Sequence, residues 1–165
     1  MSRPNRIENF FAIVDEVRKR SHDAQTQVGA LCVKQETNAI IATGCNGYVR
    51  GAPDDHLPNT RPEKYEYILH AEENLIANCA HHGISMEGCF VVLSVNPCIK
   101  CTRLLYQCGI TRVLCREVYP KYFQPVLEMH DLRVDVNHFQ EAGFYELTIS
   151  PRHSDDPILQ DHKGA

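Results

Sequence analysis

The sequence lacks any long apolar run. No segment approaches the ~20 apolar residues that a membrane-spanning helix needs, so we expect no membrane association. It also lacks a positively charged amino-terminal segment followed by an apolar stretch, which is the pattern of a secretory signal. We therefore expect a cytoplasmic protein whose thiols are reduced.

A basic excess is also missing. The chain has 17 Lys and Arg against 21 Asp and Glu, with a formal net charge of −4. Proteins that bind nucleic acids usually carry a basic surface, so the charge argues against a nucleic-acid partner, although a small anion could still bind. With 165 residues, we expect one domain over residues 1–150 and a flexible tail over residues 151–165.

The eight cysteines include only one Cys-x-x-Cys motif, formed by Cys98 and Cys101. Because there is no second such motif, the sequence does not favour a closed structural zinc knuckle. Most of the other cysteines fall in apolar runs and are interpreted as small core residues: Cys32, Cys45, Cys89, Cys108 and Cys115.

Two short motifs carry the chemistry, His70-Ala71-Glu72 and Pro97-Cys98-Ile99-Lys100-Cys101. A catalytic zinc needs three protein ligands, such as His nitrogens and Cys sulfurs, and an open position for water, whose pKa the metal lowers to about 7. We predict that His70, Cys98 and Cys101 are those ligands. Glu72 would point roughly 200° away from His70 on a helix, so it is better placed to take a proton from the water. This combined pattern is the signature of zinc-dependent nucleobase deaminases.

Hydrophobic periodicity predicts an α/β fold. Residues 4–20 form an amphipathic helix, and residues 28–34 and 39–45 form an antiparallel hairpin. Helices are expected over 69–82, 98–108 and 122–130, and strands over 89–95, 110–116 and 132–136. The alternation of these elements predicts parallel strands. We expect a three-layer α/β/α sandwich with a central five-stranded mixed sheet, and residues 138–149 as an appendage or a partner contact.

The segments around the two motifs also suggest function. Gly44-Cys45-Asn46-Gly47 is either a tight turn or a site where the Asn46 amide binds a sugar hydroxyl, and the sequence leaves both open. Residues 48–67 form a long loop, and long loops in small domains are usually functional. Cys98 and Cys101 begin a helix, which stabilises their thiolates, and their spacing puts both sulfurs on one helix face.

Four further segments accompany the two motifs: Thr26-Gln27-Val28-Gly29-Ala30, Gly44-Cys45-Asn46-Gly47, Asp54-Asp55 and Lys64-Tyr65. In order and spacing, these segments and the two motifs resemble those of deoxycytidylate (dCMP) deaminases, which belong to the cytidine deaminase superfamily. The resemblance covers roughly residues 5–137. It implies a cytidine deaminase-like fold and zinc-dependent hydrolysis of dCMP to dUMP and ammonia, which feeds dTMP synthesis.

The resemblance also implies roles for single residues. Glu72 would carry the proton, the Ala71 N–H would bind the ring carbonyl, and Asn46 would bind the 3′-hydroxyl. Some relatives have a basic residue near the phosphate on the helix where this chain has His81 and His82, so Tyr119 and Lys121 are the expected substitutes. The full set of predicted substrate contacts is Thr26, Val28, Asn46, Ala71, Tyr119 and Lys121.

Regulation is a further implication of the resemblance. Many such enzymes are homohexamers that dCTP activates and dTTP inhibits. The effector site would contain Asn46, Gly47, Arg50, Asp54 and Asp55, and Mg²⁺ would accompany the triphosphate. The alternative is that the acidic pair is only a solvated turn.

Two other functions remain open on the sequence alone. One is a deaminase of the same fold that acts on cytidine, dCTP or a tRNA adenosine. The acidic charge disfavours tRNA, and the long loop disfavours the shorter free-nucleoside enzymes. The other is a non-catalytic zinc-binding subunit, which the presence of Glu72 disfavours.

Overall fold

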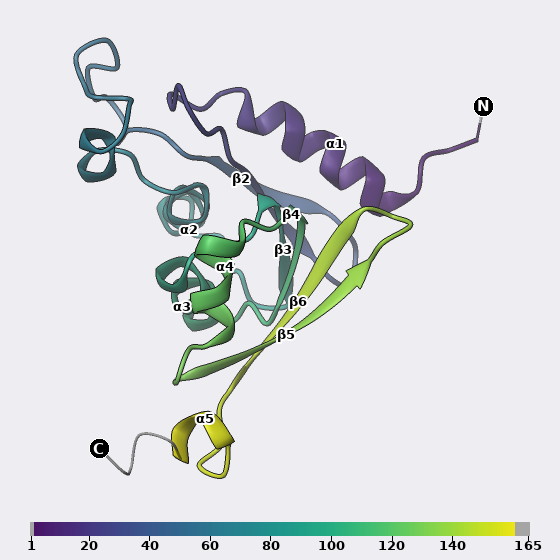
Figure 1. Cartoon of the computed structure of the whole chain (residues 1–165). Coiled ribbons are helices and arrows are strands. Elements are labelled where there is room, and N and C mark those ends of the chain that lie inside the picture. Colours follow the sequence, from purple (N-terminus) through teal and green to yellow (C-terminus); the bar gives the residue numbers. More distant parts are fainter. Residues whose placement is uncertain (1, 161–165) are drawn as a thin grey trace.

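A six-stranded mixed sheet organises the chain in the computed structural model, which describes residues 2–160 (Figure 1). The strand order is β2-β1-β3-β4-β6-β5. Within residues 2–160 no helix is long and apolar enough to span a membrane. The strands are β1 (Gly29–Lys34), β2 (Ile40–Cys45), β3 (Cys89–Val95), β4 (Arg112–Glu117), β5 (Leu132–Phe139) and β6 (Phe144–Pro151). The helices are α1 (Arg6–Arg18), α2 (Ala71–His81), α3 (Ile99–Gln107), α4 (Pro120–Leu127) and α5 (Pro157–Gln160), with a 3-10 turn, η1 (Glu63–Glu66).

Helices cover both faces of the sheet, as expected for a three-layer sandwich (Figure 1). Successive side chains of a strand point to opposite faces, so Leu31 and Val33 pack with α1, whereas Ala30 and Cys32 pack in the core that contains α2 and α3. These four side chains are fully buried. The alternation of β1 therefore supports two separate cores, one on each face of the sheet.

Helix α1 begins where the sequence provides a cap. The Asn5 side chain accepts hydrogen bonds from the backbone N–H groups of Ile7 and Glu8, and the Asn5 N–H donates to the Glu8 carboxylate. This reciprocal arrangement is a capping box, and it satisfies donors that the first turn of a helix leaves without partners. The predicted helix over residues 4–20 is confirmed, and the observed helix begins two residues later and ends two residues earlier.

The predicted five-stranded sheet is wrong in the number of its strands. Residues 144–151, placed by the sequence outside the sheet, form β6, which pairs antiparallel with both β4 and β5. A tight turn joins β5 to β6, since the Gly143 N–H donates to the Phe139 carbonyl and Gly143 has a φ of 68°. Hairpin formation thus puts β6 in the position next to β4, and β5 becomes an edge strand rather than a parallel neighbour of β4.

The α/β fold with a mixed sheet is confirmed, and β3 with β4 is the one parallel pair within residues 2–160. Helix α3 makes the crossover between them, so the carboxyl end of β3 leads into the amino end of α3. Of the predicted tail, Pro151 ends β6 and residues 157–160 form α5, while residues 161–165 lie outside the described part of the chain. The division of the chain at residue 150 stays a prediction.

Candidate active site

The amino ends of α2 and α3 meet beside the carboxyl end of β3. His70 is the N-cap residue of α2 and Cys98 is the N-cap residue of α3. Glu73 joins the two helix starts, because its carboxylate accepts a hydrogen bond from the His70 N–H at 2.8 Å and lies 2.8 Å from the Lys100 ammonium. Both helices therefore direct their positive ends toward one small region.

His70, Cys98 and Cys101 form a compact cluster in that region. Their ligand atoms lie within 4.8 Å of one another. The Nδ1 atom of His70 is 3.7 Å from the sulfur of Cys98 and 3.5 Å from that of Cys101. Two ligands at about 2.0–2.3 Å from a tetrahedral zinc lie about 3.5–3.8 Å apart. The three side chains thus fit a zinc ion in both chemistry and spacing.

The three side chains of the cluster also shift one another's pKa values. The hydrogen bond with Cys101 lowers the pKa of Cys98 to about 4, and the hydrogen bond with Cys98 raises the pKa of His70 to about 9. The hydrogen bond between Cys98 and Cys101 also raises the pKa of the Cys101 thiol. One thiolate is therefore ready at neutral pH, while the second thiol and the imidazolium would release protons on metal binding.

Glu72 lies almost fully buried next to this cluster, with 4% of its surface exposed. Burial raises the pKa of its carboxyl to about 7. A group whose pKa is near the working pH can both accept and donate a proton. Glu72, His70 and Cys98 line the same cavity, so a ligand in that cavity can contact the carboxyl and the cluster together.

The cavity has a volume of about 210 Å³, far more than the ~10–15 Å³ that one water molecule needs. Most of the predicted substrate contacts line it: Thr26, Val28, Asn46, Ala71 and Tyr119. Lys121, which is also among the described residues, lies outside its lining, and its ammonium is 5.7 Å from the centre of the Tyr122 ring. The cavity can therefore hold a small organic molecule rather than a few waters.

The Asn46 amide is held in place by three hydrogen bonds. Its oxygen accepts from the Val28 N–H at 2.8 Å, and its NH₂ donates to the Thr26 carbonyl at 2.8 Å and to the Asp23 carboxylate at 3.3 Å. Both amide protons are therefore used, and the oxygen keeps one lone pair. From this position Asn46 can accept a hydrogen bond from a ligand hydroxyl.

Comparison with known proteins agrees with this geometry. The family model of the cytidine and deoxycytidylate deaminase zinc-binding region matches residues 4–117, a range that contains the whole cluster and Glu72. The chain belongs to the cytidine and deoxycytidylate deaminase family. The predicted resemblance to this family is thereby confirmed.

Relatives within the deaminase family differ in how much of their length this chain covers. Human deoxycytidylate deaminase is 36% identical over 113 residues, which are 65% of this chain and 62% of the human protein. An uncharacterized deaminase of the luxG 3′ region of Aliivibrio fischeri is 34% identical over 144 residues, 87% of this chain and 92% of that protein. The chain thus spans under two thirds of the human relative.

A solved structure gives the same family assignment. The dCMP deaminase of cyanophage S-TIM5, in complex with dCMP and dUMP, superimposes with a TM-score of 0.63 at 26% sequence identity. The superposition covers 78% of this chain and 93% of the phage protein. The cytidine deaminase-like fold predicted from the sequence is confirmed.

Several cavity residues were not among the site residues predicted from the sequence, although the Lys64-Tyr65 segment contributed to the family resemblance. The amide oxygen of Asn96 accepts from the Tyr119 N–H at 2.8 Å and so fixes the loop that carries Tyr119. The other additional residues with polar side chains are Asp23, Arg61, Lys64, Tyr65 and Tyr122. The length of the loop over residues 48–67 indicated a functional segment, but it did not identify which of its side chains face the cavity.

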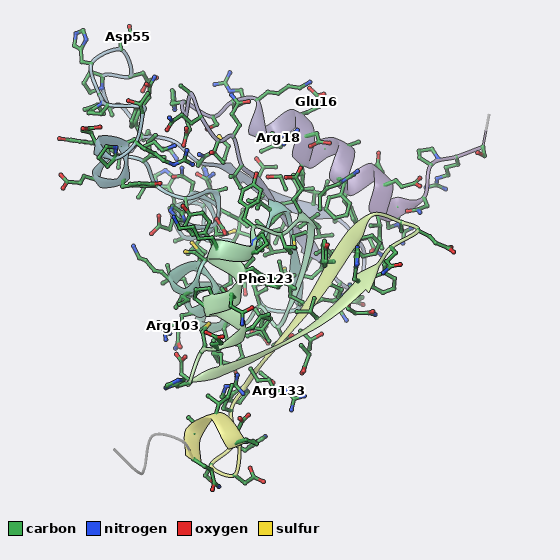
Figure 2. All side chains as sticks on the ribbon, in the orientation of Figure 1. Glu16, Arg18, Asp55, Arg103, Phe123 and Arg133 are labelled. Atoms are coloured by element: carbon green, nitrogen blue, oxygen red, sulfur yellow. The ribbon has the colours of Figure 1, made fainter. Side chains whose placement is uncertain are left out.

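The residues expected at an effector site lie mostly outside the cavity. Asp54 has a carboxylate oxygen 2.8 Å from Nε2 of His22, whose ring stacks on Tyr48 with 5.2 Å between the ring centres. Asp55 lies at the outer tip of its loop (Figure 2). Among the described residues of the predicted effector set, Asn46 lines the cavity, whereas Gly47, Arg50, Asp54 and Asp55 do not.

Proposed function

We propose that this protein hydrolyses dCMP to dUMP and ammonia. The observation that carries the proposal is the cavity that the buried Glu72 carboxyl shares with His70 and Cys98, which belong to the cluster with Cys101. Membership of the deaminase family supports the reaction class. The names of the human and phage relatives, both dCMP deaminases, support the choice of substrate.

The proposal includes a zinc ion held by His70, Cys98 and Cys101. A zinc ion with an open position supplies Lewis acidity, which makes a water molecule a nucleophile at neutral pH. The donor set of one imidazole and two thiols, and the separations of 3.5 and 3.7 Å, support this choice of metal.

Glu72 is proposed to move the protons of the reaction. It would accept a proton from the water that attacks C4 of the ring, and deliver it to N3. It would then carry the second proton of that water to the amino group, so that the C4–N bond breaks and ammonia leaves. Its burial in the cavity and a pKa of about 7 support a group that can work in both directions.

The substrate would be held mainly by fixed backbone and amide groups. Ala71 is the first residue of α2, where helix N–H groups have no partner within the helix, so its N–H is available to the ring carbonyl. The remaining lone pair of Asn46 suits the 3′-hydroxyl of the sugar. Thr26 and Val28 would contact the nucleotide from the segment just before β1, and Tyr119 would close over it.

The loss of absorbance on deamination provides the test. We expect turnover of dCMP, and little or none of cytidine or dCTP. The Glu72→Ala variant should keep its zinc and lose turnover, while Glu16→Ala on the exposed side of α1 should match the wild type (Figure 2). Faster turnover of cytidine or dCTP than of dCMP would show that the proposed substrate is wrong. Full activity of Glu72→Ala would refute the mechanism.

Regulation by dCTP and dTTP is proposed at the loop over residues 46–55. Asn46 belongs to this loop and also holds Val28 and Thr26 in the cavity wall, so a ligand that moved the loop would change the cavity. Mg²⁺ would accompany the triphosphate. Initial rates at subsaturating dCMP should rise with dCTP and fall with dTTP, and rates that respond to neither would refute regulation.

A homohexamer and a cytoplasmic location complete the proposal. Light scattering coupled to size-exclusion chromatography should give the mass of six chains. A monomer mass would refute the assembly without affecting the proposed chemistry.

A further inference from the structure

The Arg61 and Lys64 side chains both line the cavity, and they differ in how their charge is balanced. Lys64 is buried and its ammonium lies 2.5 Å from the Asp23 carboxylate, so its charge is neutralised inside the protein. Across residues 2–160 no Asp or Glu side chain forms an ion pair with Arg61. The guanidinium of Arg61 therefore brings to the cavity a positive charge that no carboxylate of the described residues pairs with directly.

Neutral oxygens hold that guanidinium in place. The Nε–H of Arg61 donates to the Tyr65 hydroxyl at 2.7 Å, and Nη2 donates to the Thr26 hydroxyl at 2.9 Å. The Arg61 main-chain N–H also donates to the Gln25 side chain at 3.0 Å. Of the five N–H donors of a guanidinium, about three remain for a ligand. The side chain is thus oriented before any ligand arrives.

We propose that Arg61 binds the 5′-phosphate of the substrate and so makes the enzyme select a nucleotide over a nucleoside. This inference rests on the proposed deamination and names the side chain that recognises the phosphate of its substrate. A planar guanidinium matches a phosphate in charge and in hydrogen-bond geometry, and forms two parallel bonds to it. The Lys64 ammonium cannot take this role without leaving Asp23 as a buried, unpaired charge.

Thr26 links this anion site to the rest of the cavity. Its hydroxyl accepts from Arg61, and its carbonyl accepts from the Asn46 amide. Arg61, Thr26 and Asn46 therefore form one connected chain of hydrogen bonds along the cavity wall. A nucleotide that contacts Asn46 through its sugar can present its phosphate to the guanidinium at the other end of that chain.

The decisive experiment compares dCMP with deoxycytidine as substrates of the wild type and of Arg61→Gln. We expect the variant to lose about 100-fold in kcat/KM for dCMP, since it loses charge-assisted bonds to the phosphate, and to change less than about threefold for deoxycytidine. Arg61→Lys should recover part of the loss, because it keeps the charge but not the paired bonds. Equal losses for both substrates, or no loss for dCMP, would overturn the proposal.

A matched control is available on the surface. Arg133 is exposed, is paired with Asp135, and lies near α5, well away from the loop that carries Asp55 (Figure 2). Arg133→Gln removes the same charge and should leave kcat/KM unchanged for both substrates. A loss in this variant equal to that in Arg61→Gln would mean that net charge alone explains the effect, and would also overturn the proposal.

A binding measurement separates this inference from the proposed function. Calorimetric titration should show that the wild type binds dUMP more tightly than deoxyuridine and that Arg61→Gln removes this preference. If the wild type deaminates no cytosine compound but the preference depends on Arg61, the phosphate site stands and the proposed function fails. If dCMP is deaminated but the preference survives Arg61→Gln, the function stands and the phosphate site is overturned.

Discussion

The ammonium of Lys64 lies 2.5 Å from a carboxylate oxygen of Asp23, and both side chains are at most 5% exposed. Asp23 also accepts hydrogen bonds from the N–H groups of Gln25 and Thr26 and from the Asn46 amide. One buried carboxylate therefore ties the segment before β1 to the end of β2 and to η1. Asp23, Asn46 and Lys64, one from each of these segments, line the cavity that His70 and Cys98 also line.

Removing Lys64 should destabilise the protein strongly. Lys64→Met leaves the Asp23 charge buried without its partner, and such a loss typically costs about 3–5 kcal/mol. Urea unfolding should report this decrease in the free energy of unfolding. Lys19→Met, which breaks an exposed pair with Glu16, should cost at most about 1 kcal/mol. Similar small losses in both variants would show that the buried pair contributes little.

The same pair predicts how stability depends on pH. Burial raises the pKa of Asp23, but its hydrogen bonds with Lys64, Gln25 and Thr26 outweigh burial and lower the pKa below the ordinary 3.8. A lowered folded pKa stabilises the folded protein above the unfolded pKa, and this stability is lost as the pH falls through the folded value. The difference in melting temperature between wild type and Asp23→Asn should be large near pH 6 and shrink below about pH 4. A difference that stays constant with pH would contradict this assignment.

The metal content should depend on the cluster and not on the other thiols. Cys101→Ser should abolish stoichiometric zinc binding, measured by atomic emission, and lower the melting temperature, because metal binding free energy adds to folding free energy. Cys108→Ser, at the end of α3 and outside the cluster, should retain one zinc per chain. Retention of a full zinc equivalent in Cys101→Ser would mean that other residues hold the metal.

Gly44 sets the distance between β2 and the start of α2. A Cβ atom at this position would meet the Ala71 carbonyl oxygen at 2.6 Å and the Leu75 backbone nitrogen at 2.7 Å. Gly44→Ala should therefore push α2 away, reduce zinc affinity, and cost about 1–3 kcal/mol of stability. Thr43→Ala, on the exposed neighbouring residue, should be close to wild type in both measurements. Unchanged zinc affinity in Gly44→Ala would show that the helix start tolerates the shift.

Local chemistry made much of the fold predictable. The period of apolar residues predicted α1 to within two residues at each end, because the residues on the buried face of an amphipathic helix recur along the sequence at the helical period. The strand from Cys89 to Val95 was predicted with the observed bounds because a short run of apolar, β-branched residues is typical of a strand buried on both faces of a sheet. Strand β6 was missed because its position next to β4 depends on the hairpin turn at Gly143 and on pairing with a strand about 30 residues away in the sequence, neither of which is a property of the segment alone.

The sequence by itself determined the family, because metal ligands and a proton carrier need particular residue types at particular spacings, and His70, Glu72 and the Cys-x-x-Cys motif meet both needs. Only the tertiary structure decided which other side chains share the cavity with them. Lys64 meets Asp23 across 41 residues of sequence, and the Arg61 side chain meets Thr26 across 35. Such contacts have no local pattern, because they follow from how the long loop over residues 48–67 packs against the segment before β1.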